Sequence, residues 1–127
     1  MTLPANARVE AAPNFLSNLN AARQFFEQQA VVSAPERFRK LKAELREMVV
    51  ILSWSPGAGR LARFLTARSA QARLRLEAVQ QLANQAGLPN LREYVVGQHL
   101  VLYAHSDVEV VLLAVKHQRQ LTYCTEL

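Results

Sequence analysis

The sequence has few of the features that are typical of proteins outside the cytoplasm, such as paired cysteines, long apolar runs and a secretory signal. It contains one cysteine, Cys124, which cannot form an internal disulfide and so suits a reducing compartment; we expect a cytoplasmic protein. No apolar run approaches the roughly 18 residues that a membrane span needs, so we expect no membrane partner. The first residues lack a basic stretch followed by an apolar one, so we expect no secretory signal.

Motifs for metal ions and nucleotide cofactors are missing as well. The single Cys and three His residues have no spacing typical of a zinc site. Gly57 and Gly59 lie close together, but no Gly-Lys-Ser/Thr follows them and no strand precedes them. They are therefore not a phosphate-binding loop. We expect neither a metal nor a cofactor.

The charge of the chain is positive and unevenly distributed. The net charge is +5, yet ten basic residues between Arg37 and Arg75 stand against only Glu44 and Glu47. This asymmetry is typical of a face that binds nucleic acid, a nucleoprotein or an acidic protein, and also of a solvated helix surface. Half of the residues are apolar, which excludes a globally disordered chain, and the length fits one domain spanning residues 1–127.

Helical spacing of apolar residues predicts three helices, near 14–30, 34–53 and 69–86. Ser33 and Glu36 are spaced as a capping box that starts the second helix. Gly87 and Pro89 end the third. We expect Trp54, where the second helix stops, to lie in the core. The second helix has the clearest apolar stripe: Phe38, Leu41, Leu45, Met48, Val49 and Leu52.

Three β-rich runs follow the helices, at 91–96, 99–104 and 108–116, and short turns separate them. This pattern predicts an antiparallel meander. The third run is apolar at nearly every position, so both of its faces should be covered. Residues 7–11 are a weaker candidate for a first strand, and residues 1–6 for a loose tail. We predict an α+β fold with helices packed on one face of a small antiparallel sheet and an extra helix before the meander.

The C-terminal third of the chain resembles a known family. A hairpin over Leu91–Tyr103 leads into a terminal strand that ends in Lys116-His117-Gln118-Arg119. This arrangement resembles the RelE/ParE superfamily of bacterial type II toxins. The helix pair, the Trp54–Arg60 connection and the Val9–Phe15 segment are similar to the same family, so the resemblance covers most of residues 7–123. The third helix, 69–87, looks like an insertion.

The resemblance implies a toxin encoded beside an antitoxin that binds and neutralises it, in a toxin–antitoxin hetero-oligomer. Two activities share this fold. ParE-like members poison DNA gyrase and are not nucleases, whereas RelE-like members cleave messenger RNA on the ribosome. Composition alone leaves a third alternative, a non-toxic basic module that binds nucleic acid or a protein.

Four of the candidate site residues lie at or after the end of the last strand, and the others precede it. A nuclease of this kind needs a base, an acid and cations that neutralise the phosphate. Its members usually carry several Lys and Arg on the second and third strands, where this chain has Glu93 and apolar Leu100, which favours gyrase as the target. We expect His99 and His105 to be turn or surface residues. The catalytic candidates for a nuclease are Arg92, Lys116, His117, Arg119 and Tyr123. The candidates for target binding are Arg60, Arg63, Lys116, His117 and Arg119.

Overall fold

The computed structural model describes residues 6–62, 70–120 and 123, with the backbone alone for 70–76. The helices are α1 (Pro13–Gln29), α2 (Ala34–Trp54) and α3 (Ala70–Ala86), and a short 3₁₀ turn, η1, spans Pro56–Ala58. The strands are β1 (Arg8–Ala11), β2 (Arg60–Leu61), β3 (Asn90–Val96), β4 (His99–His105) and β5 (Glu109–His117). The predicted helices and strands are confirmed to within one residue at each end. β2 was not predicted.

The strands form one mixed sheet in the order β1-β5-β4-β3-β2. β3, β4 and β5 are the predicted antiparallel meander. β1, however, pairs in parallel with β5, and so the prediction of an antiparallel sheet is wrong at this edge. The backbone N–H groups of Arg8 and Ala12 donate to the carbonyls of Val108 and Leu112, on the side of β5 that β4 leaves open. A four-residue strand carries no sequence signal for the direction in which it pairs.

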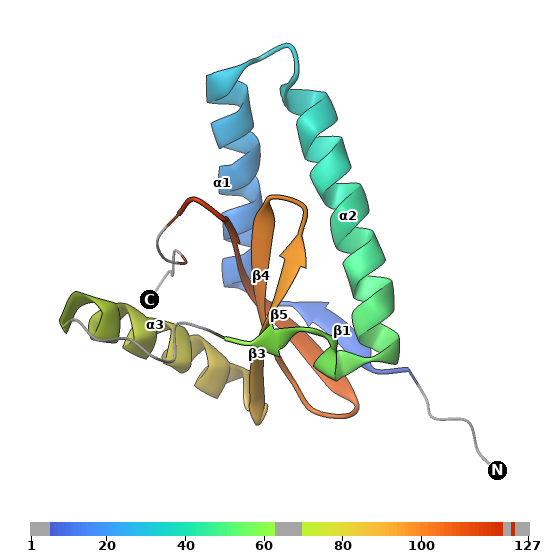
Figure 1. The fold of residues 1–127 in the computed structure, drawn as a ribbon, viewed down its shortest axis with the longest axis vertical. Coiled ribbons are helices and arrows are strands. Elements are labelled where there is room, and N and C mark those ends of the chain that lie inside the picture. The colour runs from blue at the N-terminus through green and yellow to red at the C-terminus, as the bar shows by residue number, and fades with distance from the viewer. Residues whose placement is uncertain (1–5, 63–69, 121–122, 124–127) are drawn as a thin grey trace.

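The helices cover both faces of the sheet, so the prediction that they share one face is wrong (Figure 1). α1 and α2 run side by side as a hairpin, and their core residues Phe15, Met48 and Leu52 pack with Val101 and Tyr103. On the other face, residues of α3 pack with residues of β4 and β5: Val79, Leu82, Leu102, Leu113 and Ala114. The reason is the composition of β4 and β5, whose two apolar faces must both be shielded from water.

A bulge in β5 sets the direction of the residues that follow it. Leu102 pairs with Ala114 and Tyr103 pairs with Leu112, which leaves Leu113 as an extra residue on β5. As a result Leu113 and Ala114 both belong to the core under α3, and Val115 belongs to the core under α1 and α2. The alternation then continues, so that Lys116 turns to the α3 face and His117 to the helix-pair face.

Two local predictions about α2 are wrong. The Ser33 backbone has helical torsion angles and its side chain makes no capping hydrogen bond, so the capping box does not form. The Trp54 side chain is 68% exposed. Trp54 lies about 200° around the helix from the buried Leu52, which turns it away from the core.

None of the described helices is both long and apolar enough to cross a membrane.

Candidate functional site

The end of β5 divides the predicted site residues between the two faces of the sheet. The Lys116 ammonium lies 5.5 Å from the centre of the Tyr123 ring, in the core region under α3. The His117 ring lies 5.2 Å from the His99 ring, on the face that α1 and α2 cover. Neighbouring residues of one strand thus belong to two separate groups of side chains.

The first group, which we name the carboxylate cluster, consists of Arg60, Glu93, Lys116 and Tyr123. Glu93 is only 4% exposed, and its Oε2 accepts a hydrogen bond of 2.5 Å from the Tyr123 hydroxyl. The pairing of β2 with β3 places Arg60 opposite Glu93. The Nε atom of Arg60 lies 3.9 Å from Oε1 of Glu93. Glu93 is therefore a buried carboxylate held by Tyr123 and lying near Arg60, and it does not project into the solvent.

The surroundings of Tyr123 favour its protonated form. Burial raises the pKa of its hydroxyl, and the hydrogen bond to Glu93 and the charge of that carboxylate raise it further. The Lys116 ammonium donates a hydrogen bond of 2.8 Å to the Gln120 carbonyl. Burial lowers the pKa of Lys116, while Glu93 acts in the opposite direction. At neutral pH Tyr123 is thus a hydrogen-bond donor to Glu93 and not a base.

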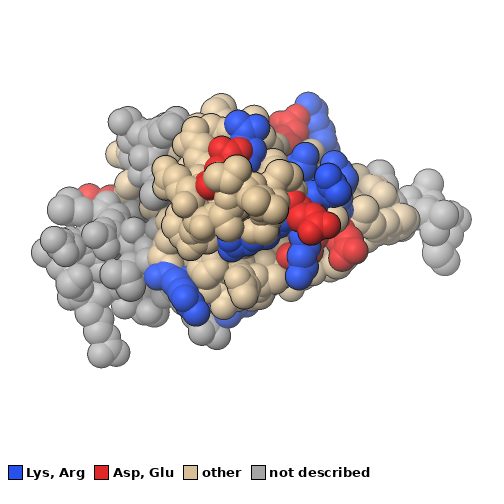
Figure 2. Space-filling model, turned by 90° about the horizontal axis from the view of Figure 1, so that it is seen from above, with Lys and Arg blue, Asp and Glu red and all other residues tan. Residues whose placement is uncertain are grey.

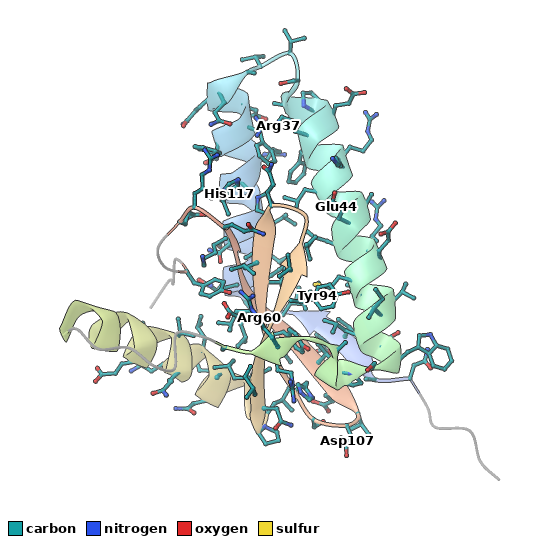
Figure 3. All side chains as sticks on the ribbon, viewed as in Figure 1. Arg37, Glu44, Arg60, Tyr94, Asp107 and His117 are labelled. Carbon is teal, nitrogen blue, oxygen red and sulfur yellow. The ribbon has the colours of Figure 1, made fainter. Side chains whose placement is uncertain are left out.

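The second group lines an open cleft between α1, the start of α2 and the segment after β5. We name it the histidine cleft; its volume is about 710 Å³. The Arg37 guanidinium lies 4.3 Å from the centre of the Phe26 ring and donates a hydrogen bond of 3.0 Å to Gln29 Oε1. The Phe26 and His99 rings are perpendicular to each other, and their centres lie 6.1 Å apart. Figure 3 shows Arg37 and His117 near the helix-hairpin end of the molecule, while Arg60 lies near the middle of the sheet.

Both histidines of the cleft are held in the neutral form. Burial, His117 and Arg37 together lower the pKa of His99 to about 4. Burial also lowers the pKa of His117, with contributions from Arg119, Arg37 and Lys116. Nδ1 of His117 accepts a hydrogen bond of 3.1 Å from the Arg119 backbone N–H. This contact leaves the proton on Nε2, which lies 3.4 Å from Gln98 Oε1.

Arg92 joins neither group. Its guanidinium donates to the Gly59 carbonyl at 2.9 Å and to Nε2 of His105 at 3.1 Å. Tyr103 accepts a hydrogen bond from the Gly59 N–H and donates one to the Pro56 carbonyl, each 2.8 Å long. These contacts, which we name the Arg92 latch, fix η1 to the sheet. Arg92 opposes Tyr103, four residues along β4 from His99, which corresponds to roughly 13 Å of strand.

The structure thus brings together Arg60, Lys116 and Tyr123 in one place, and His117 and Arg119 in another. Arg63 lies outside the described residues. His99 and His105 are both buried, which makes the prediction of turn or surface histidines wrong. Sequence reasoning missed Arg37 and Phe26 as parts of the cleft. No feature of the sequence distinguishes Arg37 from the other basic residues of its helix.

The sequence suggests a basic surface, but the face drawn in Figure 2 carries both positive and negative side chains. On the face in Figure 2, Lys and Arg side chains adjoin Asp and Glu side chains and do not form an area of one sign. α2 itself carries five basic residues and three glutamates. Much of the remaining basic excess, at Arg63, Arg68, Arg73 and Arg75, lies outside the side chains that the structure describes.

Comparison of the chain with models of known protein families and with curated proteins found no match. Within residues 6–62, 70–120 and 123, no three His, Cys, Asp or Glu side chains are grouped so that they could hold a metal ion. What the described side chains offer is a set of hydrogen-bonded internal contacts and one open basic cleft.

Proposed function

We propose that this chain is the toxin component of a type II toxin–antitoxin module, that it resembles ParE, and that it arrests growth by poisoning DNA gyrase. A cognate antitoxin neutralises it in a hetero-oligomer, and its target requires a cytoplasmic location. The family resemblance supports the module. The choice of gyrase is supported by one observation: the side chains that a nuclease would need are divided among separate places in the fold, and three of them are engaged in internal hydrogen bonds.

Three of the five nuclease candidates are held by hydrogen bonds within the fold. Arg92 belongs to the Arg92 latch, Tyr123 donates to Glu93, and Lys116 donates to the Gln120 carbonyl. A nuclease must place cations, base and acid around one phosphate, where removal of a single stabilising group costs about 3 kcal/mol. A protein that poisons gyrase by docking needs only an accessible surface, which His117 and Arg119 can contribute at the edge of the histidine cleft.

A RelE-like ribosome-dependent nuclease is the second candidate, and the carboxylate cluster is the observation that favours it. Tyr123, Lys116 and Glu93 lie together near the end of the last strand, with shifted pKa values at Tyr123 and Lys116. Such shifts are common at catalytic sites. A non-toxic module that binds nucleic acid or protein through its basic side chains is the third alternative.

Induction in a growing host tests these alternatives, together with purified gyrase and with ribosome-bound messenger RNA. We expect the wild type to arrest growth and to inhibit supercoiling, and the pair His117→Ala and Arg119→Ala to weaken both effects. Tyr123→Phe, which keeps the ring and removes the hydroxyl, should retain gyrase inhibition. Codon-specific cuts that Tyr123→Phe abolishes, with supercoiling untouched, would establish the nuclease. Normal growth on full expression would favour the non-toxic module.

A further inference from the structure

All ionisable side chains among the described residues that line the histidine cleft are basic. They are Arg37 from α2, His99 from β4, and Lys116, His117 and Arg119 from the end of β5 and the segment after it. The residues that α1 contributes carry no charge. The Glu44 carboxylate lies against Gly97 and is not part of this lining. The two histidines are neutral at pH 7 and Lys116 lies near Glu93, so the attraction for an anion comes chiefly from Arg37 and Arg119, beside which no described carboxylate lines the cleft.

The two walls of the cleft differ in chemical character. On the helix side, Arg37 is held over Phe26, and the half-exposed Phe25 and the small Ala21 and Ala22 give an apolar surface. On the sheet side, the Arg119 N–H fixes the His117 ring, so that Nε2 carries its proton. The remaining lining is rich in amide side chains: Asn18, Gln29, Gln98, Gln118 and Gln120. A volume of about 710 Å³ accommodates a small organic molecule.

We propose that the histidine cleft binds a small organic anion, whose phosphate or carboxylate group is held by Arg37, His117 and Arg119 and whose apolar or aromatic part lies against Phe25 and the alanines of α1. The ammonium of Lys116 does not take part directly, because it donates to the Gln120 carbonyl and lies beside Tyr123. The site does not depend on the toxin role, and its ligand need not be part of the growth-arrest mechanism.

Proton uptake should accompany binding. In the free protein, burial and the charges of Arg119, Arg37 and Lys116 hold the pKa of His117 below its ordinary value. The other titratable group that faces His117 is His99, which is neutral above its pKa of about 4. A bound anion offsets the positive charges and favours imidazolium, so the pKa of His117 rises in the complex. For a carboxylate ligand, which stays ionised in this range, affinity should therefore increase as the pH falls from 7 towards 5.

The experiment uses the full chain and four probes: inorganic phosphate, adenosine 5′-monophosphate, phenylacetate and neutral adenosine. Binding is measured by calorimetry, and the His117 ring resonances are followed by NMR as the pH changes. We expect saturable binding of the monophosphate or of phenylacetate, at least about tenfold tighter than that of phosphate alone or of adenosine. Which of the two organic anions binds more tightly tells whether phosphate or carboxylate is the natural group.

Three variants that each remove one positive charge test whether the ligand binds in the histidine cleft. Arg37→Gln and Arg119→Gln should each weaken binding by roughly tenfold, because each removes a charged hydrogen-bond donor. Arg39→Gln is the matched control: it removes one positive charge from the same helix, and Arg39 is exposed and lies about 200° around α2 from Arg37. Its affinity should change less than twofold. Arg119 is an exposed residue whose structural contact is made by its backbone, so its variant should fold normally.

Three results would overturn the proposal. The first is the absence of saturable binding of every probe up to about 10 mM. The second is an affinity for adenosine equal to that for adenosine 5′-monophosphate, together with no binding of phenylacetate. The third is an Arg39→Gln variant that loses as much affinity as Arg37→Gln, since the attraction would then come from the general positive charge and not from the cleft.

Discussion

His99 is buried against Phe26 and His117, and its pKa of about 4 in the folded protein lies below its ordinary value of 6.5. Between these two pH values the unfolded chain binds the proton more tightly than the folded one, so stability falls as the pH drops from 6.5 to 4. We expect this residue to account for a loss on the order of 2 kcal/mol in the free energy of unfolding, measured by urea denaturation.

His99→Gln is the control for that measurement, since glutamine does not titrate. The difference in stability between wild type and variant should shrink as the pH falls from 6.5 to 4, because only the wild type loses the contribution of this site. A constant difference across the range would contradict the neutral, buried state of His99. Comparing the two proteins at each pH cancels the titration of the carboxylates, which both contain.

At Tyr123, removing the hydroxyl leaves the buried Glu93 carboxylate without one of its donors. Tyr123→Phe should therefore destabilise the protein by about 1–3 kcal/mol. Tyr94→Phe is the matched control, because the Tyr94 hydroxyl makes no hydrogen bond that is seen among the described residues, and it should change stability by less than about 0.5 kcal/mol. Equal effects of the two changes would mean that the Tyr123–Glu93 contact contributes nothing to stability.

At the scale of elements, η1 and β2 depend on a glycine that packs directly on the sheet. A Cβ atom at Gly59 would lie 2.6 Å from both the Glu93 carbonyl oxygen and the Tyr103 hydroxyl. Gly59→Ala must therefore push β2 away from β3 or break the Arg92 latch. We expect a loss of about 2–3 kcal/mol in the free energy of unfolding, measured by thermal or urea denaturation.

Gly57→Ala provides the comparison two residues away in the same connection. The nearest atom to a Cβ at Gly57 is Nε of Arg92 at 3.9 Å, an ordinary contact. The change should alter stability by less than about 0.5 kcal/mol. If both alanine variants behave alike, the close approach of Gly59 to the sheet is not the feature that holds the connection.

The sequence predicted the elements well and their arrangement less well, for identifiable reasons. The stripe of α2 and the β-branched runs of β4 and β5 are local patterns, and local patterns determine where elements begin and end. The parallel pairing of β1 joins residues about a hundred positions apart, and two-residue β2 has no pattern at all. The apolar residues on both faces of β5 do predict cover on both sides, which the helix pair and α3 provide.

The same distinction applies to the candidate site. Lys116, His117 and Arg119 were found because they follow one another at the end of a strand. Alternation along the strand places Lys116 and His117 on opposite faces, but which face each takes depends on the bulge at Leu113, which β-branched and apolar residues do not encode. Arg37 and Phe26 join the cleft only because the helix pair packs on the face of the sheet that carries His99 and His117. Tertiary contacts of this kind have no counterpart in residue spacing.

At the scale of the whole molecule, an exposed apolar surface remains at the C-terminal end of α2. Val50, Ile51 and Trp54 lie within about one turn of each other, and their exposed fractions are 58%, 43% and 68%. Adjacent exposed apolar side chains are typical of a protein-binding surface, and tryptophan is the residue type most often found at the energetic centre of one. On the proposed function, the antitoxin is the partner that covers it.

Trp54 is the only tryptophan of the chain, so its fluorescence reports on this surface alone when the partner contains none. Titration with the protein encoded beside this one should shift the emission to shorter wavelength and protect it from acrylamide. Trp54→Gln should weaken the complex by about 2 kcal/mol or more, roughly thirtyfold in Kd.

Val32→Gln is the control, at a residue 97% exposed in the turn between α1 and α2, and should change Kd less than threefold. Complex formation by light scattering with unchanged Trp54 emission, or a larger effect of Val32→Gln, would place the antitoxin elsewhere on the molecule.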